Sequence, residues 1–252
     1  MRILAMDTAT SAITVAVHDG ETVLAARATI DARRHTELLA PLVLEALAAA
    51  STTAGEITHV AVGTGPGPFT GLRVGLVTAH TFAHARGIAV HGVCSLDALA
   101  AAAARQGHEG DLLVATDARR KEVYWARYRC AAGQASAFDQ PTVTKPADLP
   151  DDVRALPTVG RGPGLYPELL PHALAPGGLD LLDVDAGVLA GVAVARIAAG
   201  EEMPIEPLYL RRPDAVAAAP HPKSSLGSSP RQQQRDLRRA AAREARGGEA
   251  TQ

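Results

Sequence analysis

The first half of the chain alternates between short segments rich in β-branched residues and longer segments with apolar positions at helical spacing. Strands are predicted over Arg2–Asp7, Ile13–Val17, Thr22–Ala28, Thr58–Thr64 and Ile88–Val93. Helices are predicted over Thr36–Ala50, Thr70–Arg86 and Ser95–Arg105. The resulting order β-β-β-α-β-α-β-α predicts a mixed sheet, in which an antiparallel meander continues into parallel strands.

Three local signals refine these elements. Asp19-Gly20 is the dipeptide that a two-residue hairpin prefers, because both positions tolerate positive φ. Thr70 can cap the helix that starts there, and Gly87 closes the same helix. Pro41 falls inside the apolar stripe of the first helix, where it either belongs to the first turn or kinks the helix.

The second half repeats this beginning more weakly. Strands are predicted over Leu112–Thr116, Glu122–Tyr128 and Ser136–Val143. The segment Pro157–Gly160, a helix near Tyr166–Leu170 and the segment Ala186–Ala199 follow. Each half therefore has an aspartate at the end of its first strand, Asp7 in the first half and Asp117 in the second. We therefore predict an α/β protein with an actin/hexokinase-like (ASKHA, RNase H-like) fold. Its first lobe spans residues 1–108, and a smaller second lobe spans residues 109–212.

The character of the sequence changes near its C-terminal end. Residues 217–252 are rich in Ala, Pro, Ser, Gln and Arg. Residues 220–252 carry seven basic and three acidic side chains, so they contribute +4 and the rest of the chain carries −6. Such a composition cannot bury a core, and we expect residues 213–252 to form a disordered basic tail. Its arginines could contact the phosphates of a nucleic acid, or the tail could be a solvated extension.

Composition and cysteine usage narrow the class of protein. Apolar residues make up 47% of the chain, whereas aromatic residues make up 3%, so the core is built mainly from small side chains. Cys94 and Cys130 have no metal-type spacing, which fits a reducing cytoplasm. The start MRILAMDTAT is unlike a signal peptide, and no long uncharged apolar run predicts a membrane span.

The segment Gly63–Gly75, GTGPGPFTGLRVG, is the most distinctive feature of the sequence. Gly65 and Gly67 permit backbone angles that other residues avoid, and the loop leads into a helix N-terminus, where an anion can bind. The same pattern also suits a rigid turn that only aims the helix. Gly71 and Gly75 share one helical stripe, which would let a backbone approach closely, either from the chain's own sheet or from another chain.

Carboxylates and histidines give two further sets of candidates. Asp7 and Asp117 follow strands at equivalent points of the two lobes, where this fold class holds a metal-bound phosphate. Thr8 stands beside the first of them. The alternative is a carboxylate that binds nearby loop amides. His80 and His84 are four residues apart, but no third ligand is near in the sequence, so we predict no metal site.

Several motifs together resemble the TsaB family, also called YeaZ. The segments that carry the resemblance are MDTAT, RRHTELLAPLV, GTGPGPFTGLRVG, DARRKEVYWARY, VGRGPGLY and PLYLRRPDAV. They span residues 1 to about 216, and GPGPFTGLRVG is the most specific of them. The resemblance implies a non-catalytic subunit of the bacterial machinery that makes threonylcarbamoyladenosine (t6A) at position 37 of tRNA.

The resemblance also implies partners and a missing metal site. The catalytic relative TsaD carries an HxxxH metal motif, and the corresponding stretch here is Gly92–Leu99, GVCSLDAL. Ser95 and Leu99 would stand in the two histidine places, so we expect neither a cofactor nor catalysis by this chain. In the family, the first two helices form a homodimer or a similar heterodimer with TsaD, which the ATPase TsaE joins. The implied partner contacts are His35, Leu38, Leu39, Leu42, Gly71, Arg73, Gly75, Val77 and His80.

Two functions therefore follow from the sequence. The first is a scaffold that binds and activates TsaD and meets tRNA only through the complex. The second is an independent enzyme of the same fold, either a small-molecule kinase or a metallopeptidase. A kinase needs two full lobes, and a peptidase needs metal ligands, so we favour the scaffold. Whether the cleft near Asp7 and Gly65 binds a nucleotide stays open at this point.

Overall fold

A mixed sheet forms the first half of the computed structural model, which describes residues 1–174 and 181–211. Its strands are β1 (Ile3–Asp7), β2 (Ala12–His18), β3 (Val23–Ile30), β4 (His59–Gly63) and β5 (Ala89–Val93). They lie in the order β3-β2-β1-β4-β5. The first three strands pair antiparallel, and β4 and β5 continue parallel to β1. The predicted meander followed by βα units is confirmed. The predicted tail at 213–252 lies outside the described residues.

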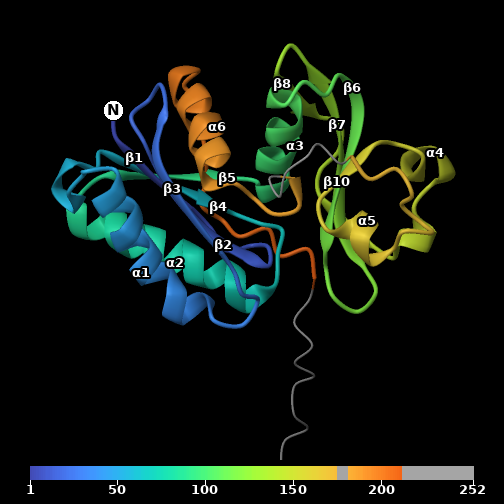
Figure 1. Ribbon diagram of the computed structural model, residues 1–252, viewed down its shortest axis with the longest axis horizontal. Helices are drawn as coiled ribbons and strands as arrows, with labels where there is room; N and C mark the ends of the chain where they lie inside the picture. Colours follow the sequence, from blue (N-terminus) through green and yellow to red (C-terminus); the bar gives the residue numbers. More distant parts are fainter. Residues whose placement is uncertain (175–180, 212–252) are drawn as a thin grey trace, which may run out of the picture. The chain divides into compact units, whose positions relative to one another are not determined.

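Helices cover both faces of this sheet (Figure 1). They are α1 (His35–Ala49) and α2 (Phe69–Arg86) on one face, and α6 (Ala186–Ala198) on the other. Side chains alternate between the two faces along each strand. In β1, Leu4 and Met6 pack with α1 and α2, whereas Ile3 and Ala5 belong to the core cluster that contains α6. The sheet is therefore buried on both sides, which explains the near-continuous apolar runs of its central strands.

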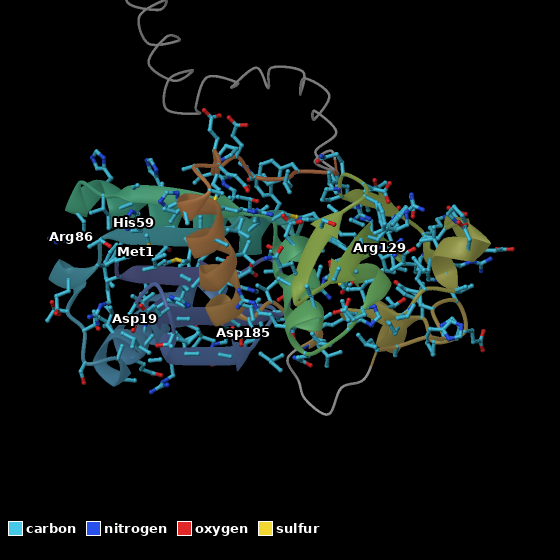
Figure 2. The ribbon with its side chains drawn as sticks, turned by 90° about the horizontal axis from the view of Figure 1, so that it is seen from above. Met1, Asp19, His59, Arg86, Arg129 and Asp185 are labelled. Carbon is cyan, nitrogen blue, oxygen red and sulfur yellow. The ribbon has the colours of Figure 1, made fainter. Side chains whose placement is uncertain are left out.

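Helix α6 packs against the first sheet, although its position in the chain suggested the second lobe. It contacts β1, β2, β4 and β5, and Figure 2 shows it lying across those strands. Asp185 caps it by accepting hydrogen bonds from the backbone N–H groups of Gly187 and Val188 at 2.6 and 2.9 Å. The helix reads AGVLAGVAVARIA, which is apolar on nearly every side and therefore needs burial. The predicted boundary between the lobes, near residue 108, stays a prediction.

A second, smaller sheet follows. Its strands are β6 (Gly110–Asp117), β7 (Val123–Ala131), β8 (Gln134–Ala137), β9 (Thr142–Thr144) and β10 (Thr158–Val159). They lie in the order β10-β6-β7-β8, and β9 also pairs with β7. The single strand predicted over Ser136–Val143 is wrong. Pairing with β7 is interrupted between β8 and β9. Pro141 has no N–H to donate to the neighbouring strand, and the Asp139 side chain accepts a hydrogen bond from Arg127.

Short helices connect the strands of the second half. They are α4 (Asp151–Arg154), α5 (Gly162–Leu165) and the 3-10 turns η1 (Ala54–Glu56) and η2 (Pro146–Asp148). The helix predicted near Tyr166–Leu170 is misplaced, because α5 ends before Tyr166. Pro163 favours the start of α5, and Pro167 disfavours helical angles at Tyr166.

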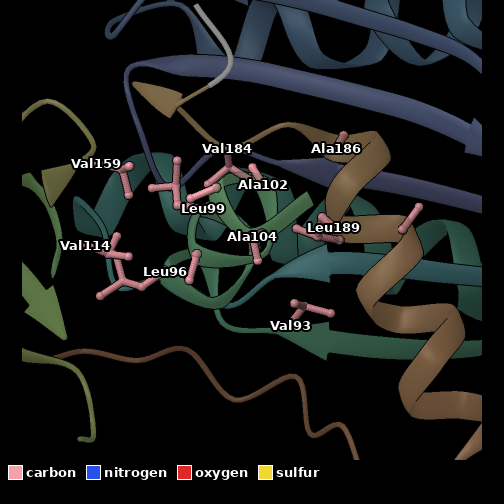
Figure 3. Close-up of a cluster of buried hydrophobic side chains, with 14 of the residues drawn as sticks. Val93, Leu96, Leu99, Ala102, Ala104, Val114, Val159, Val184, Ala186 and Leu189 are labelled. Carbon is pink, nitrogen blue, oxygen red and sulfur yellow. The ribbon is translucent and has the colours of Figure 1, made fainter. Parts of the chain in front are cut away.

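The buried helix α3 (Ser95–Arg105) joins the two sheets. It contacts β6, β7, β8, β10 and α6. Figure 3 shows Leu96 and Leu99 of α3 in one apolar cluster with Val114, Val159 and Leu189, which come from β6, β10 and α6. The predicted bounds of α3 are confirmed. Its small side chains let both sheets approach closely, as the scarcity of aromatic residues suggested.

Two local predictions need correction. The β2–β3 loop has four residues rather than two, because His18 pairs with Val23 and Asp19 accepts hydrogen bonds from two backbone N–H groups of the loop. Helix α2 begins at Phe69 after Pro68, so Thr70 lies within its first turn and does not cap it. Pro41 lies inside α1, beyond the first turn. In the described ranges, no helix has the length and apolar character needed to cross a bilayer.

Candidate functional site

The glycine loop after β4 is buried and bonded to α3. Gly63, Gly65 and Gly67 are all buried, and Gly65 has a φ of +88°. The Gly65 carbonyl accepts a hydrogen bond from the Ser95 backbone N–H at 2.8 Å. The Gly65 N–H in turn donates to Ser95 Oγ at 3.2 Å. An amide that already donates to a buried hydroxyl is not free to bind phosphate. The Gly65 amide is therefore used within the chain, where it ties the loop to the start of α3.

Asp7 lies at the end of β1, beside this loop, and is 1% exposed. Its Oδ2 accepts a hydrogen bond from Ser95 Oγ at 2.6 Å, and its Oδ1 accepts one from the Ala9 N–H at 2.8 Å. Burial raises the pKa of Asp7 to about 6, despite the two hydrogen bonds, which lower it. A side chain at Gly63 would place its Cβ 1.7 Å from Asp7 Oδ2. The Asp7–Ser95–Gly65 cluster is thus a tight structural junction between β1, the glycine loop and α3.

Thr8 fastens α2 to the end of β1. Its Oγ1 donates to the Gly71 carbonyl at 2.8 Å and accepts from the Gly75 N–H at 3.0 Å. A Cβ at Gly75 would lie 2.5 Å from Thr8 Oγ1, and one at Gly71 would lie 2.8 Å from the Thr8 carbonyl oxygen. The close approach that these glycines permit is therefore made by the chain's own first strand. This corrects the prediction of Gly71 and Gly75 as partner contacts, because both are buried within the chain.

A cavity of about 270 Å³ opens beside this junction. Thr8 and Asp117 both line it, so the structure brings two of the predicted cleft residues together. Asp7, Gly65 and Gly67 do not line it and are buried. Asp117 pairs with Arg119, whose Nη1 lies 3.0 Å from Asp117 Oδ2. Arg161 binds Asp183 through two hydrogen bonds of 2.9 and 2.5 Å. The carboxylates of this cavity are thus paired with guanidinium groups.

The predicted partner residues on α1 and α2 fall into two groups. His35, Leu39 and Leu42 are buried beneath α1, and His35 Nε2 lies 3.4 Å from the Thr10 carbonyl oxygen. They support the helix and are not offered to a partner. Leu38 is half-buried, and the exposed members are Arg73, Val77 and His80 on the outer face of α2. Val77 is 59% exposed, which is unusual for a valine in the middle of a long helix.

Two aromatic residues that the sequence analysis missed extend this outer face. Phe69 is 51% exposed and Tyr209 43%, and their ring centroids are 5.1 Å apart. The Arg73 guanidinium lies over the Phe69 ring, 5.0 Å from its centroid. Phe69, Arg73 and Val77 are spaced by four residues, so the stripe was visible in the sequence. Tyr209 gave no local signal. A groove of about 430 Å³ runs along the stripe.

Ser95 and Leu99, where the resemblance implies that the histidines of a metal motif would stand, do not fit a metal here. Leu99 has no exposed surface and packs in the apolar cluster around α3 (Figure 3). Ser95 is fully buried, and its hydroxyl is used by Asp7 and Gly65. Within the described part of the chain, no group of three or more His, Cys, Asp or Glu side chains is placed to hold a metal ion.

Comparison with known proteins identifies the family. The sequence model of the TsaD family, described as tRNA N6-adenosine threonylcarbamoyltransferase, matches residues 26–156. An Escherichia coli protein named tRNA threonylcarbamoyladenosine biosynthesis protein TsaB is 34% identical over 224 residues, which cover 84% of this chain and 95% of that protein. This chain belongs to the TsaB family. An uncharacterized protein of Mycobacterium tuberculosis is 45% identical over 220 residues, which cover 86% of this chain and 95% of that one.

Solved structures of TsaB relatives share this fold. A structure described as YeaZ from Pseudomonas aeruginosa has a TM-score of 0.67 at 31% identity, covering 82% of this chain and 98% of that one. Another from the same organism, described as an uncharacterized protein with similarity to peptidase YeaZ, has a TM-score of 0.71 at 32% identity, covering 83% and 99%. The resemblance to TsaB and the actin/hexokinase-like α/β fold are both confirmed.

Proposed function

We propose that this chain is a non-catalytic subunit of the machinery that makes t6A at position 37 of tRNA, and that it acts by binding the catalytic subunit TsaD. The likeness to the Escherichia coli protein named for t6A biosynthesis, across 95% of that protein, carries this proposal. The site of action is then the cytoplasm, where tRNA is modified. TsaE joins the complex, and the chain forms a homodimer when TsaD is absent.

The buried junction supports a scaffold rather than a transferase. The match to a transferase family covers residues 26–156, which include Gly92–Leu99, the stretch that the resemblance places opposite the HxxxH motif of TsaD. In this chain Leu99 fills an apolar core at that place, and Ser95 is bonded to Asp7. A metal at this place would displace Leu99 from the apolar core and break the hydrogen bond between Ser95 and Asp7. The chain thus keeps the fold of the transferase family, whereas Ser95 and Leu99, in the places of the two histidines, contribute to packing.

The outer face of α2 supports a protein partner. An arginine, a phenylalanine and a valine lie in line on it, with Tyr209 beside them. Aromatic and arginine side chains dominate the binding energy of protein interfaces, and they act best in desolvated apolar surroundings. We propose the half-buried Leu38 and the exposed Arg73, Val77 and His80 as contacts, with Phe69 and Tyr209 added to them.

A substitution on this face tests the proposal. Val77→Glu places a charge in the proposed interface, so we expect it to weaken TsaD binding at least about thirtyfold, which corresponds to roughly 2 kcal/mol. Leu165→Glu is the matched control, because Leu165 is 48% exposed on α5, away from this face. Binding is measured by titration calorimetry with TsaD from the same organism. Equal affinity of both variants and the native chain would reject this interface.

The alternative, an independent kinase or metallopeptidase, is decided by the purified chain. Turnover of ATP or of peptides by the chain alone would favour it. Loss of that turnover on chelation would favour the peptidase. We expect neither activity, since the proposed role requires TsaD for any chemistry.

A further inference from the structure

The turn between β6 and β7 carries three consecutive basic residues in an uncommon backbone conformation. Arg119, Arg120 and Lys121 have φ values of 60°, 52° and 62°. Residues other than Gly, Asn and Asp avoid this left-handed region of backbone conformation, because their Cβ crowds the neighbouring carbonyl oxygen. Two backbone hydrogen bonds hold the turn: Ala118 N–H to the Glu122 carbonyl at 3.0 Å, and Glu122 N–H to the Arg119 carbonyl at 2.9 Å. All three basic side chains are exposed. The turn is thus a constrained basic surface.

Further positive charge gathers around this turn. Arg119 lines the 270 Å³ cavity, and so do Arg33 from the loop before α1 and Arg161 from the start of α5. Arg211 pairs with Glu122, at the end of the turn. Burial lowers the pKa of Arg211, and the charge of Arg120 lowers it further, so the two guanidinium groups are near each other. Residues 1–219 carry −6, so this concentration of basic groups runs against their overall charge.

These basic residues differ in what they bind within the chain. Arg119, Arg161 and Arg211 form ion pairs with carboxylates. By contrast, the side chains of Arg33 and Lys121 have no hydrogen bond or ion pair within residues 1–174 and 181–211. Both are exposed, one at the cavity and the other in the turn. Arg33 therefore presents a cation at the cavity, and Lys121 presents one in the same turn as Arg119, which also lines the cavity.

We propose that the β6–β7 turn, together with Arg33, contacts the sugar–phosphate backbone of the tRNA that the complex modifies. A lysine and several arginines near one another neutralise successive phosphates, and no base stacking is needed for such a contact. The contact is independent of base sequence, so it positions the tRNA while TsaD selects the base. This inference rests on the proposed function, because the substrate is the tRNA of the t6A reaction.

The experiment uses the assembled complex with TsaD and an unmodified tRNA transcript that has adenosine at position 37. The variant is Arg33→Gln/Lys121→Gln, which removes two charges that have no partner within the described chain. The control is Arg86→Gln/Arg105→Gln, which removes two exposed charges at the C-terminal ends of α2 and α3. Arg86 ends α2 at the far left of Figure 2, in the part of the first lobe remote from the second sheet. A third variant, Arg33→Lys/Lys121→Arg, keeps both charges.

The readout is the tRNA dissociation constant between 50 and 200 mM salt. Loss of two phosphate contacts reduces the salt slope by about 1.6, so the affinity of the Gln variant should fall about tenfold less across this range than that of the native complex. The control and the charge-retaining variant should match the native complex. An unchanged slope in the Gln variant would overturn the inference.

Complex assembly is measured on the same samples, which separates this inference from the proposed function. If the Gln variant weakens TsaD binding while tRNA affinity per assembled complex is unchanged, the basic turn contacts an acidic protein surface, and the RNA contact is rejected. If no variant and no native chain binds TsaD, the proposed function itself fails. Millimolar ATP should leave the difference in salt slope unchanged. Loss of that difference in the presence of ATP would mean that Arg33 and Lys121 bind a nucleotide, and the RNA contact would be rejected.

Discussion

Ionisation of Asp7 should make the protein less stable as pH rises. Burial raises its pKa in the folded protein to about 6, from 3.8 for an ordinary aspartate. The folded state therefore holds the Asp7 proton over a pH range in which the unfolded chain has released it. The stabilisation is fully present below pH 3.8 and is lost as pH rises through about 6. A difference of about two pKa units corresponds to about 3 kcal/mol of lost stability at pH 8.

Asp7→Asn removes this cost and keeps the geometry. The amide oxygen can accept from the Ala9 N–H, and the amide nitrogen can donate to Ser95 Oγ. We expect the variant to be more stable than the native chain at pH 8. The difference in unfolding free energy should grow by about 2 to 3 kcal/mol between pH 4 and pH 7. Urea unfolding of both proteins at several pH values measures it, and other titrating groups cancel in the comparison.

Asp148→Asn is the control for this series, because Asp148 is exposed in η2. Its difference from the native chain should stay flat across the same pH range. A constant difference for Asp7→Asn between pH 4 and pH 8 would refute the reasoning. A fall in the stability of Asp7→Asn relative to the native chain as pH rises would also refute it. Either result would mean that Asp7 is hydrated or ionised at no cost in the folded protein.

Three further outcomes follow from the junction and the core. Gly63→Ala should cost at least about 3 kcal/mol in urea unfolding, since its Cβ would lie 1.7 Å from Asp7 Oδ2; a loss below about 1 kcal/mol would contradict the packing. Tyr128→Phe should cost about 1 to 3 kcal/mol, because Asp97 Oδ1 loses the 2.8 Å bond from the buried phenol; a neutral effect would mean that water replaces it. Elemental analysis of the purified chain should find iron and zinc far below one per chain, and stoichiometric metal would argue against the scaffold.

The elements of the first half could be predicted because their signals are local. Short apolar runs predicted β1 and β4, and apolar positions at helical spacing predicted α3, each to within a residue or two. The second half was harder, because Pro141 and Pro167 interrupt patterns that otherwise continue. The place of α6 could not be predicted. Its all-round apolar surface indicates burial, but the face that it covers depends on how distant strands come together.

The sequence indicated several residues of the site, but not which residues they contact. Asp7 and Gly65 were predicted to lie at the cleft, but both are buried and do not line the cavity, and their common partner Ser95 comes from a helix far along the chain. The small residues Gly71 and Gly75 indicated a close approach without saying to what. Only the fold shows that Thr8 is the residue that approaches these two glycines. The exposed surface of α2 is therefore a different face, which carries Arg73, Val77 and His80.

The central claim is that the chain works by pairing with TsaD. Multi-angle light scattering of the purified chain, of TsaD and of their mixture at micromolar concentration tests this most directly. We predict a homodimer for the chain alone and a one-to-one heterodimer in the mixture, with t6A formation only when TsaD is present. A mixture that elutes as two separate species, or t6A formation by the chain without TsaD, would contradict the account.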